Sequence, residues 1–127
     1  MTNKPLLTIY KASAGSGKTF TLAAEYISLL LQKPDDFRHI LAVTFTNKAT
    51  GEMKERILSQ LYGIGQGLPE SEGYLDKVKE LLKAANITTD VNHNRLTDDQ
   101  LRENARKALT YILHNYSFFR IETIDSF

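Results

Sequence analysis

The stretch Ala12-Ser13-Ala14-Gly15-Ser16-Gly17-Lys18-Thr19 lies between two apolar stretches and decides how the chain begins to fold. Before it, residues 6–11 carry Leu, Ile, Thr and Tyr side chains that predict a short buried strand. After it, apolar side chains recur at helical spacing over residues 18–32. A glycine-bearing loop between a strand and a helix is the setting of a phosphate-binding loop. The sequence therefore predicts a site for nucleotide phosphates at the start of this helix.

The residue types of this loop suit an anionic ligand. Gly15 and Gly17 can take positive φ and bring the backbone close to phosphate oxygens. Consecutive N–H groups then form an anion-binding concavity at the positive end of a helix. Lys18 can reach the β- and γ-phosphates of ATP, and the Thr19 hydroxyl can ligate Mg²⁺. We expect Lys18 and Thr19 to be catalytic, and the nucleotide-binding residues to be Ala14, Gly15, Ser16, Gly17, Lys18 and Thr19.

The loop departs from the strict pattern G-x-x-x-x-G-K-[ST], because Ala12 stands where the first glycine belongs. The shorter core G-x-G-K-[ST] is complete. The alternative interpretation is an ordinary glycine-rich turn that starts a helix.

The following segments predict a parallel sheet. Residues 39–45 form a continuous apolar run, typical of a parallel strand that is covered on both faces. Apolar residues that step by four from Ala49 to Leu61 predict a second helix, which ends near Tyr62 with Gly63 as its cap. The order strand, loop, helix, strand, helix predicts the α/β class with a parallel sheet.

The middle of the chain departs from this alternation. Residues 63–73 are rich in glycine and predict a loop. Amphipathic helices follow over residues 74–85 and 98–116, and the polar residues 90–95 between them are expected to be exposed. The second helix starts with a capping-box pair, Thr97 and Gln100, and its apolar stripe comprises Leu101, Ala105, Ala108, Leu109, Ile112 and Leu113. A third strand is predicted over residues 118–124.

Length and composition exclude several classes of protein. The 127 residues fit one domain, and the formal net charge of +1 means that nucleic-acid binding needs a local patch. The absence of cysteine excludes disulfides and cysteine-ligated metals. No apolar run is long enough for a membrane span or a signal peptide, so we expect a cytoplasmic protein without membrane partners.

Polar side chains gather where the second strand passes into its helix. Ligands of open α/β sheets bind at this carboxyl edge. Phe45 can stack a nucleobase, and Thr46, Asn47 and Lys48 can hold backbone phosphates. The alternative is a strand end followed by a capped amphipathic helix. In either case Lys54 and Arg56 are expected on a solvated face.

Residues 43–57 resemble motif Ia of the superfamily 1 DNA helicases of UvrD/Rep/RecB type, in which Thr-Phe-Thr-Asn-Lys-Ala-Ala precedes Glu-Met and Arg-Ile. Thr50 and Gly51 depart from the small residues usual there. The phosphate loop followed by residues 20–22 looks like the RecB/AddA branch, as does the terminal Thr123-Ile124-Asp125-Ser126-Phe127, with Asp125 in place of histidine.

This resemblance implies an ATP-driven DNA helicase that translocates along a single strand, as one subunit or half of a helicase–nuclease. It implies a RecA-like P-loop NTPase fold: an incomplete parallel sheet with flanking helices and a two-helix insertion at about residues 68–116. ATP and Mg²⁺ are the implied cofactors. Single-stranded DNA is implied to contact Phe45, Thr46 and Asn47, and the DNA backbone to contact Thr123 and Ser126.

Catalysis in this class needs an adjacent pair of carboxylates on a later strand. No apolar run in the sequence ends in Asp-Glu. We therefore expect residues 1–127 to be the N-terminal part of a motor domain, inactive by itself and prone to self-association through unpaired strand edges. Two alternatives stay open: a small P-loop kinase, and a non-catalytic module that binds phosphate and protein.

Overall fold

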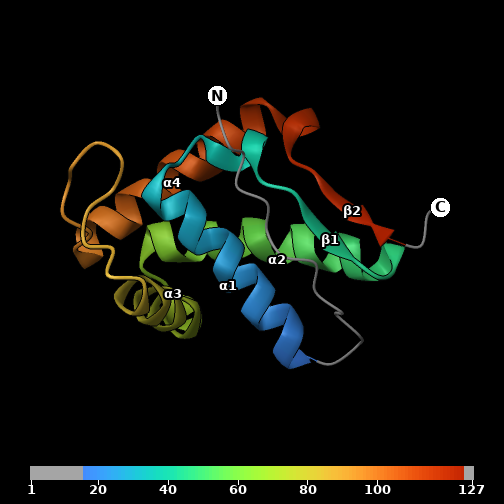
Figure 1. Cartoon of the computed structure of the whole chain (residues 1–127), viewed down its shortest axis with the longest axis horizontal. Helices are drawn as coiled ribbons and strands as arrows, with labels where there is room; N and C mark the ends of the chain where they lie inside the picture. The colour runs from blue at the N-terminus through green and yellow to red at the C-terminus, as the bar shows by residue number, and fades with distance from the viewer. Residues whose placement is uncertain (1–15, 125–127) are drawn as a thin grey trace.

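Helices account for most of the chain that the computed structural model describes, which is residues 16–124 (Figure 1). The α-helices are α1 (Ser16–Gln32), α2 (Asn47–Gln66), α3 (Glu72–Ala84) and α4 (Asp98–His114). Three short 3-10 helices are η1 (Asp36–His39), η2 (Pro69–Ser71) and η3 (Tyr116–Phe118), and the strands are β1 (Ala42–Thr44) and β2 (Ile121–Thr123).

The two strands form a parallel pair, as the sequence predicts. Ala42 lies opposite Ile121 and Thr44 opposite Thr123, and α2 begins directly after β1 (Figure 1). Both strands are shorter than predicted, and the 3-10 helices η1 and η3 precede them in the chain. The described residues thus contain a small piece of the expected parallel sheet, whereas the predicted strand at residues 6–11 lies outside them.

Helix α1 forms the centre of the core. Its apolar stripe is fully buried, as predicted from its spacing, and comprises Leu22, Ala23, Tyr26, Ile27 and Leu30. The helix packs against α2, α3 and α4. The Tyr26 ring meets the ring of Phe119 edge-on, with 5.8 Å between centroids, and thereby joins α1 to the segment that leads into β2.

Helix α2 is longer than predicted. The expected cap at Gly63 is wrong, because the helix continues to Gln66 and ends at Gly67, whose φ of 71° is the left-handed conformation of a C-terminal cap. Gly63 is instead a packing residue: a Cβ there would lie 1.8 Å from Oγ of Ser71. Most of the predicted loop over residues 63–73 is therefore helical, in α2, η2 and the start of α3.

The two helices predicted after this region are confirmed as α3 and α4, although Leu113, predicted in the apolar stripe of the second helix, is exposed. Helix α4 lies against α2, and two of its arginines bond to the carboxyl end of α2. Arg102 donates to the carbonyl oxygen of Ile64 at 3.3 Å, and Arg106 donates to that of Gly65 at 2.6 Å. The carbonyl oxygen of Ile64 also accepts the N–H of Gly67 at 3.1 Å, so Arg102 adds a second bond there, whereas Arg106 satisfies one of the last carbonyls of the helix.

One residue of the loop before α4 is buried, contrary to expectation. Asp90 is 6% exposed, and its carboxylate accepts hydrogen bonds from the backbone of Asn92 and Asn94 and from the amide of Asn104. Burial by itself would raise the pKa of Asp90, but the bonds from Asn104, Asn94 and Asn92 outweigh it and the pKa lies below its ordinary value. The other residues from 91 to 95 are exposed, as predicted.

Only the threonine bond of the capping box predicted at the start of α4 is confirmed. Thr97 accepts the N–H of Gln100 at 3.2 Å. The amide of Gln100, however, donates to Asn104 at 3.0 Å. The capping box predicted from the sequence is therefore a single threonine cap, because the buried Asn104 offers Gln100 another partner.

Candidate functional site

The amino end of α1 carries the described part of the predicted phosphate loop. The helix begins at Ser16, so Gly17, Lys18 and Thr19 belong to its first turn, and Thr19 is half-buried. This turn contains no acidic residue. No negative side chain of this turn would therefore repel a phosphate. The first N–H groups of a helix lack partners within it and attract anions. Ala14 and Gly15 lie outside the described residues.

The amino end of α2 follows directly from β1 and presents polar groups to solvent. Thr46 is the N-cap, and its Oγ1 accepts the N–H of Ala49 at 3.0 Å. Thr46, Asn47 and Lys48 are exposed, whereas Phe45 is half-buried. A hydroxyl that accepts one bond keeps its own proton, so Thr46 can still donate to an oxygen such as that of a phosphate.

The carboxyl end of β2 lies beside this turn. Oγ1 of Thr123 is 2.8 Å from Oγ1 of Thr50, which is itself 2.7 Å from Oγ1 of Thr44. The structure thereby brings together two stretches that are far apart in the sequence, the motif Ia-like segment and the start of the terminal motif. Ser126, predicted to contact the DNA backbone, lies outside the described residues.

Thr50 has a structural role that the sequence does not reveal. The residue departs from the pattern that residues 43–57 resemble, and no local spacing links it to Thr123, which is 73 positions away. Only the parallel register of β1 and β2 makes the contact possible. A polar residue in place of a small one in the first turn of a helix is the one signal that points to it.

Two basic residues of α2 differ from their predicted solvated state. Nζ of Lys54 lies 5.4 Å from the ring centroid of Tyr116 and 5.8 Å from that of Phe119. Arg56 donates to the hydroxyl of Tyr74 at 3.2 Å. Both side chains therefore hold α2 against its neighbours, since a cation over an aromatic face is attracted to it and a guanidinium can donate to a phenol oxygen.

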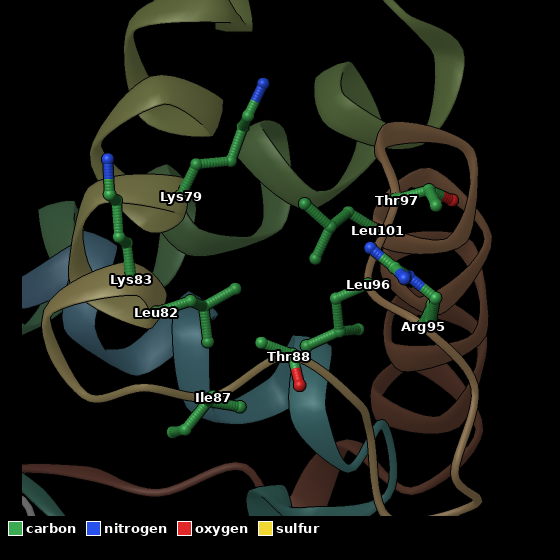
Figure 2. Close-up of a pocket in the computed structure, with 9 residues that line it drawn as sticks. All are labelled: Lys79, Leu82, Lys83, Ile87, Thr88, Arg95, Leu96, Thr97 and Leu101. Atoms are coloured by element: carbon green, nitrogen blue, oxygen red, sulfur yellow. The ribbon is translucent and has the colours of Figure 1, made fainter.

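A pocket of about 340 Å³ lies between α3 and α4, apart from the strand ends (Figure 2). Figure 2 shows Lys79 and Lys83 extending from α3, while Arg95 stands at the other side of the hollow. Its apolar lining comprises Leu82, Ile87, Leu96 and Leu101. Lys79 forms an ion pair with Asp98 at 3.0 Å and so joins the two helices beside the pocket. None of the residues predicted to bind nucleotide or DNA lines it.

Residues 16–124 offer neither a metal cluster nor a membrane span. No group of three or more His, Cys, Asp or Glu side chains in this part of the chain has the arrangement needed to hold a metal ion. None of the helices within this range has the length and apolar character needed to cross a membrane.

The model of the UvrD/REP helicase N-terminal domain matches residues 2–124. The chain belongs to this family. The family relationship that the phosphate loop and residues 43–57 predict is therefore confirmed. A UvrD N-terminal domain implies a P-loop helicase fold, with which the parallel pair β1–β2 and its flanking helices are consistent.

Several curated proteins are similar to parts of the chain. An ATP-dependent helicase/nuclease subunit of Alkaliphilus metalliredigens (strain QYMF) is 41% identical over 81 residues, which make up 64% of this chain and 7% of that protein. RecBCD enzyme subunit RecB of Escherichia coli (strain K12) is 44% identical over 62 residues, 42% of this chain and 5% of that protein. The chain thus matches only 5% to 7% of the length of these relatives. No solved structure matches it.

Proposed function

We propose that this chain is the ATP-binding N-terminal part of an ATP-dependent DNA helicase, or of one subunit of a helicase–nuclease, that moves along single-stranded DNA. The observation that carries the proposal is the family match over residues 2–124, which includes the phosphate loop. The similarity to RecB and to a protein named as an ATP-dependent helicase/nuclease supports the same activity.

The phosphate loop and the first turn of α1 form the proposed nucleotide site. The N–H groups of residues 14–17 would receive the phosphate oxygens, Lys18 would neutralise the β- and γ-phosphates, and Thr19 would ligate Mg²⁺. The absence of acidic side chains from this turn fits such a ligand. Bound ATP with Mg²⁺ supplies the phosphoryl group whose transfer to water drives a helicase.

We expect the 127-residue chain to bind ATP with negligible turnover. Hydrolysis needs one carboxylate to hold Mg²⁺ and another to orient the attacking water. The sequence has no apolar run that ends in Asp-Glu. Steady Mg²⁺-dependent ATP hydrolysis that Lys18→Ala removes would contradict this expectation.

The carboxyl edge of β1 and β2 forms the proposed DNA site. Thr46 and Asn47 are exposed there and offer a hydroxyl proton and amide protons to phosphate oxygens. Phe45 would stack on a base, and Thr123 and Ser126 would complete the surface on the side of β2. Aromatic stacking with backbone contacts is how proteins bind single strands without reading their sequence.

Two proposed partners follow from the same relationship. The first is a second subunit of a helicase–nuclease, as the names of the relatives suggest. The second is another copy of this chain, joined through the strand edges that β1 and β2 leave unpaired within residues 16–124, because an unpaired strand edge attracts another chain. Sedimentation that shows a stable monomer at high concentration would contradict the second.

The experiment that tests the nucleotide site compares Lys18→Ala with Lys107→Ala, which changes an exposed lysine of α4. We expect Lys18→Ala to weaken ATP binding by about 100-fold, because two charge-assisted contacts of roughly 1.5 kcal/mol each are lost. The fold, measured by circular dichroism, should be unchanged in both variants. Unchanged ATP affinity of Lys18→Ala, measured with a fluorescent ATP analogue and Mg²⁺, would overturn the site.

A titration with a fluorescein-labelled oligothymidylate tests the DNA site. We expect weak binding whose affinity falls as salt rises, because neutralised phosphates release counterions. No binding at low salt would overturn the DNA part of the proposal. Phosphoryl transfer to a small acceptor would instead indicate a kinase.

A further inference from the structure

Three threonine hydroxyls form a continuous hydrogen-bonded chain at the edge proposed to bind DNA. Oγ1 of Thr44 lies 2.7 Å from Oγ1 of Thr50, and Oγ1 of Thr50 lies 2.8 Å from Oγ1 of Thr123. Thr44 is fully buried, and the other two are half-buried. Because Thr44 and Thr123 are register partners in the parallel sheet, the Thr50 hydroxyl bridges the two strands at their carboxyl ends.

This chain of hydroxyls continues to the backbone at the start of α2. Thr44 donates to the carbonyl oxygen of Thr46 at 3.3 Å. In the bond between Thr44 and Thr50 and in the bond between Thr50 and Thr123, either hydroxyl can be the donor. The chain runs from Thr123 through Thr50 and Thr44 to the carbonyl of Thr46, which also accepts the N–H of Thr50 at 3.0 Å.

The chain thus ends on the residue that caps α2. Thr46 presents its exposed hydroxyl at the first turn of that helix, while its carbonyl oxygen receives the last bond of the chain. The end of β2 and the amino end of α2 are therefore connected by side-chain bonds as well as by the sheet. Thr123 on one side of the edge, and Thr46 and Asn47 on the other, are the groups proposed to contact the same DNA strand. These bonds hold the two sides at a fixed distance from each other.

We propose that Thr50 is a positioning residue for single-stranded DNA. Its hydroxyl fixes Thr123 relative to Thr46 and Asn47, so that both sides of the edge present their groups to the DNA backbone together. The inference rests on the proposed function and adds the residue that aligns the site. Fixing donor groups before the ligand arrives lowers the ordering cost of binding.

The test uses matched variants of the full chain. Thr50→Val keeps the shape of the side chain and removes the hydroxyl, whereas Thr50→Ser keeps the hydroxyl and removes the methyl group. Thr110→Val is the control, because Thr110 donates to a carbonyl of its own helix at an exposed position of α4. If Thr50→Val does not fold, as judged by circular dichroism, Thr50→Ala takes its place in the same comparison with Thr50→Ser.

The readout is the anisotropy of a fluorescein-labelled oligothymidylate across a range of KCl concentrations. We expect Thr50→Val to bind about five-fold more weakly at every salt concentration, the effect of one lost hydrogen bond. The slope of affinity against salt should not change, because no charge is removed. Thr50→Ser should bind within about two-fold of the unchanged chain, and Thr110→Val should match it.

A double variant tests whether Thr50 acts through Thr123. In a Thr123→Val background, Thr50→Val should cause no further loss of affinity, since residues of one network are not additive. If Thr50 had a purely structural role, Thr50→Val would lower the unfolding midpoint, and Thr50→Ser would not restore DNA affinity.

The possible results separate this inference from the proposed function. If the unchanged chain binds DNA and Thr50→Val binds it equally well, the positioning role is overturned and the proposed function stands. If the unchanged chain does not bind DNA, the DNA site and the positioning role both fail, while ATP binding and its loss in Lys18→Ala still decide the nucleotide site.

Discussion

Helices α2 and α4 begin in the same way but have different first turns. Each has a threonine N-cap in extended conformation whose hydroxyl accepts the N–H three residues on: Thr46 from Ala49 at 3.0 Å, and Thr97 from Gln100 at 3.2 Å. The first turn of α4 carries two acidic residues, Asp98 and Asp99. The first turn of α2 carries none, and neither does that of α1.

This difference in charge separates a helix end that stabilises the fold from one that can take a ligand. Negative side chains complement the positive end of α4, and Asp98 also pairs with Lys79 of α3. The first turns of α1 and α2 hold no acidic residue of their own that would neutralise the positive helix end. The same local structure thus serves packing in the two-helix segment and, in our proposal, phosphate binding at the other two helix starts.

The largest expected effect on stability comes from the loop that leads into α4. Asp90→Asn places a second amide against that of Asn104 and removes a charge-assisted acceptor, so we expect a loss of about 2 kcal/mol in the free energy of unfolding. Asp76→Asn, at an exposed position of α3, is the matched control and should change little. Urea titration measures both. Affinity for single-stranded DNA should not change in either variant.

The same substitution changes the response to acid. The folded-state pKa of Asp90 lies below its ordinary value. The contribution of Asp90 to the free energy of unfolding is therefore complete at a pH above its unfolded-state pKa of about 3.9. This contribution is lost as the pH falls through the folded-state pKa. The unchanged chain should therefore lose more stability on acidification below about pH 4 than Asp90→Asn does. If both proteins lost the same stability on acidification, the ionised Asp90 carboxylate would not be the group that stabilises this loop.

A smaller effect is expected from two glycines at opposite ends of α2. Gly63→Ala places a Cβ 1.8 Å from Oγ and 2.8 Å from Cβ of Ser71, and we expect a net loss of about 1–2 kcal/mol from overpacking. Gly51→Ala meets nothing within 4 Å and should instead stabilise the helix by about 0.5–1 kcal/mol. If Gly63→Ala and Gly51→Ala shifted the urea midpoint in the same direction, the packing of Gly63 against Ser71 would be contradicted.

An effect of similar size is expected from the two threonine caps. Thr46→Ala and Thr97→Ala should each lower the free energy of unfolding by about 1 kcal/mol, because each leaves one helix N–H without its cap. Only Thr46→Ala should also weaken binding of an oligothymidylate, by a few-fold. An equal effect of both variants on DNA affinity would remove the distinction between the two helix starts.

Local signals in the sequence predicted most of the helical structure. The spacing of Leu22, Tyr26 and Leu30 indicated the buried face of α1, and the run before Thr44 indicated a parallel strand. The end of α2 was predicted wrongly because Gly63 has the residue type of a cap. Its true role depends on Ser71, which tertiary packing brings against it.

The candidate site divides in the same way. Lys18, Thr19, Thr46 and Asn47 could be selected from sequence, because the chemistry of phosphate and DNA binding restricts the residue types in these short stretches. The predicted roles of all four stay predictions, as do those of the other predicted nucleotide- and DNA-binding residues. Asn104, the buried partner of Asp90, gave no signal in a helix whose apolar stripe it interrupts.

The sequence by itself determined the family, the class of ligand expected at α1 and the order of strands and helices, because each depends on residues within a few positions of one another. The tertiary structure decided which distant residues meet. Thr50 reaches Thr123 only because β1 and β2 pair in parallel register, and Asp90 meets Asn104 only because α4 packs beside the loop that carries Asp90. Hydrogen bonds across such separations depend on packing, which no local pattern encodes.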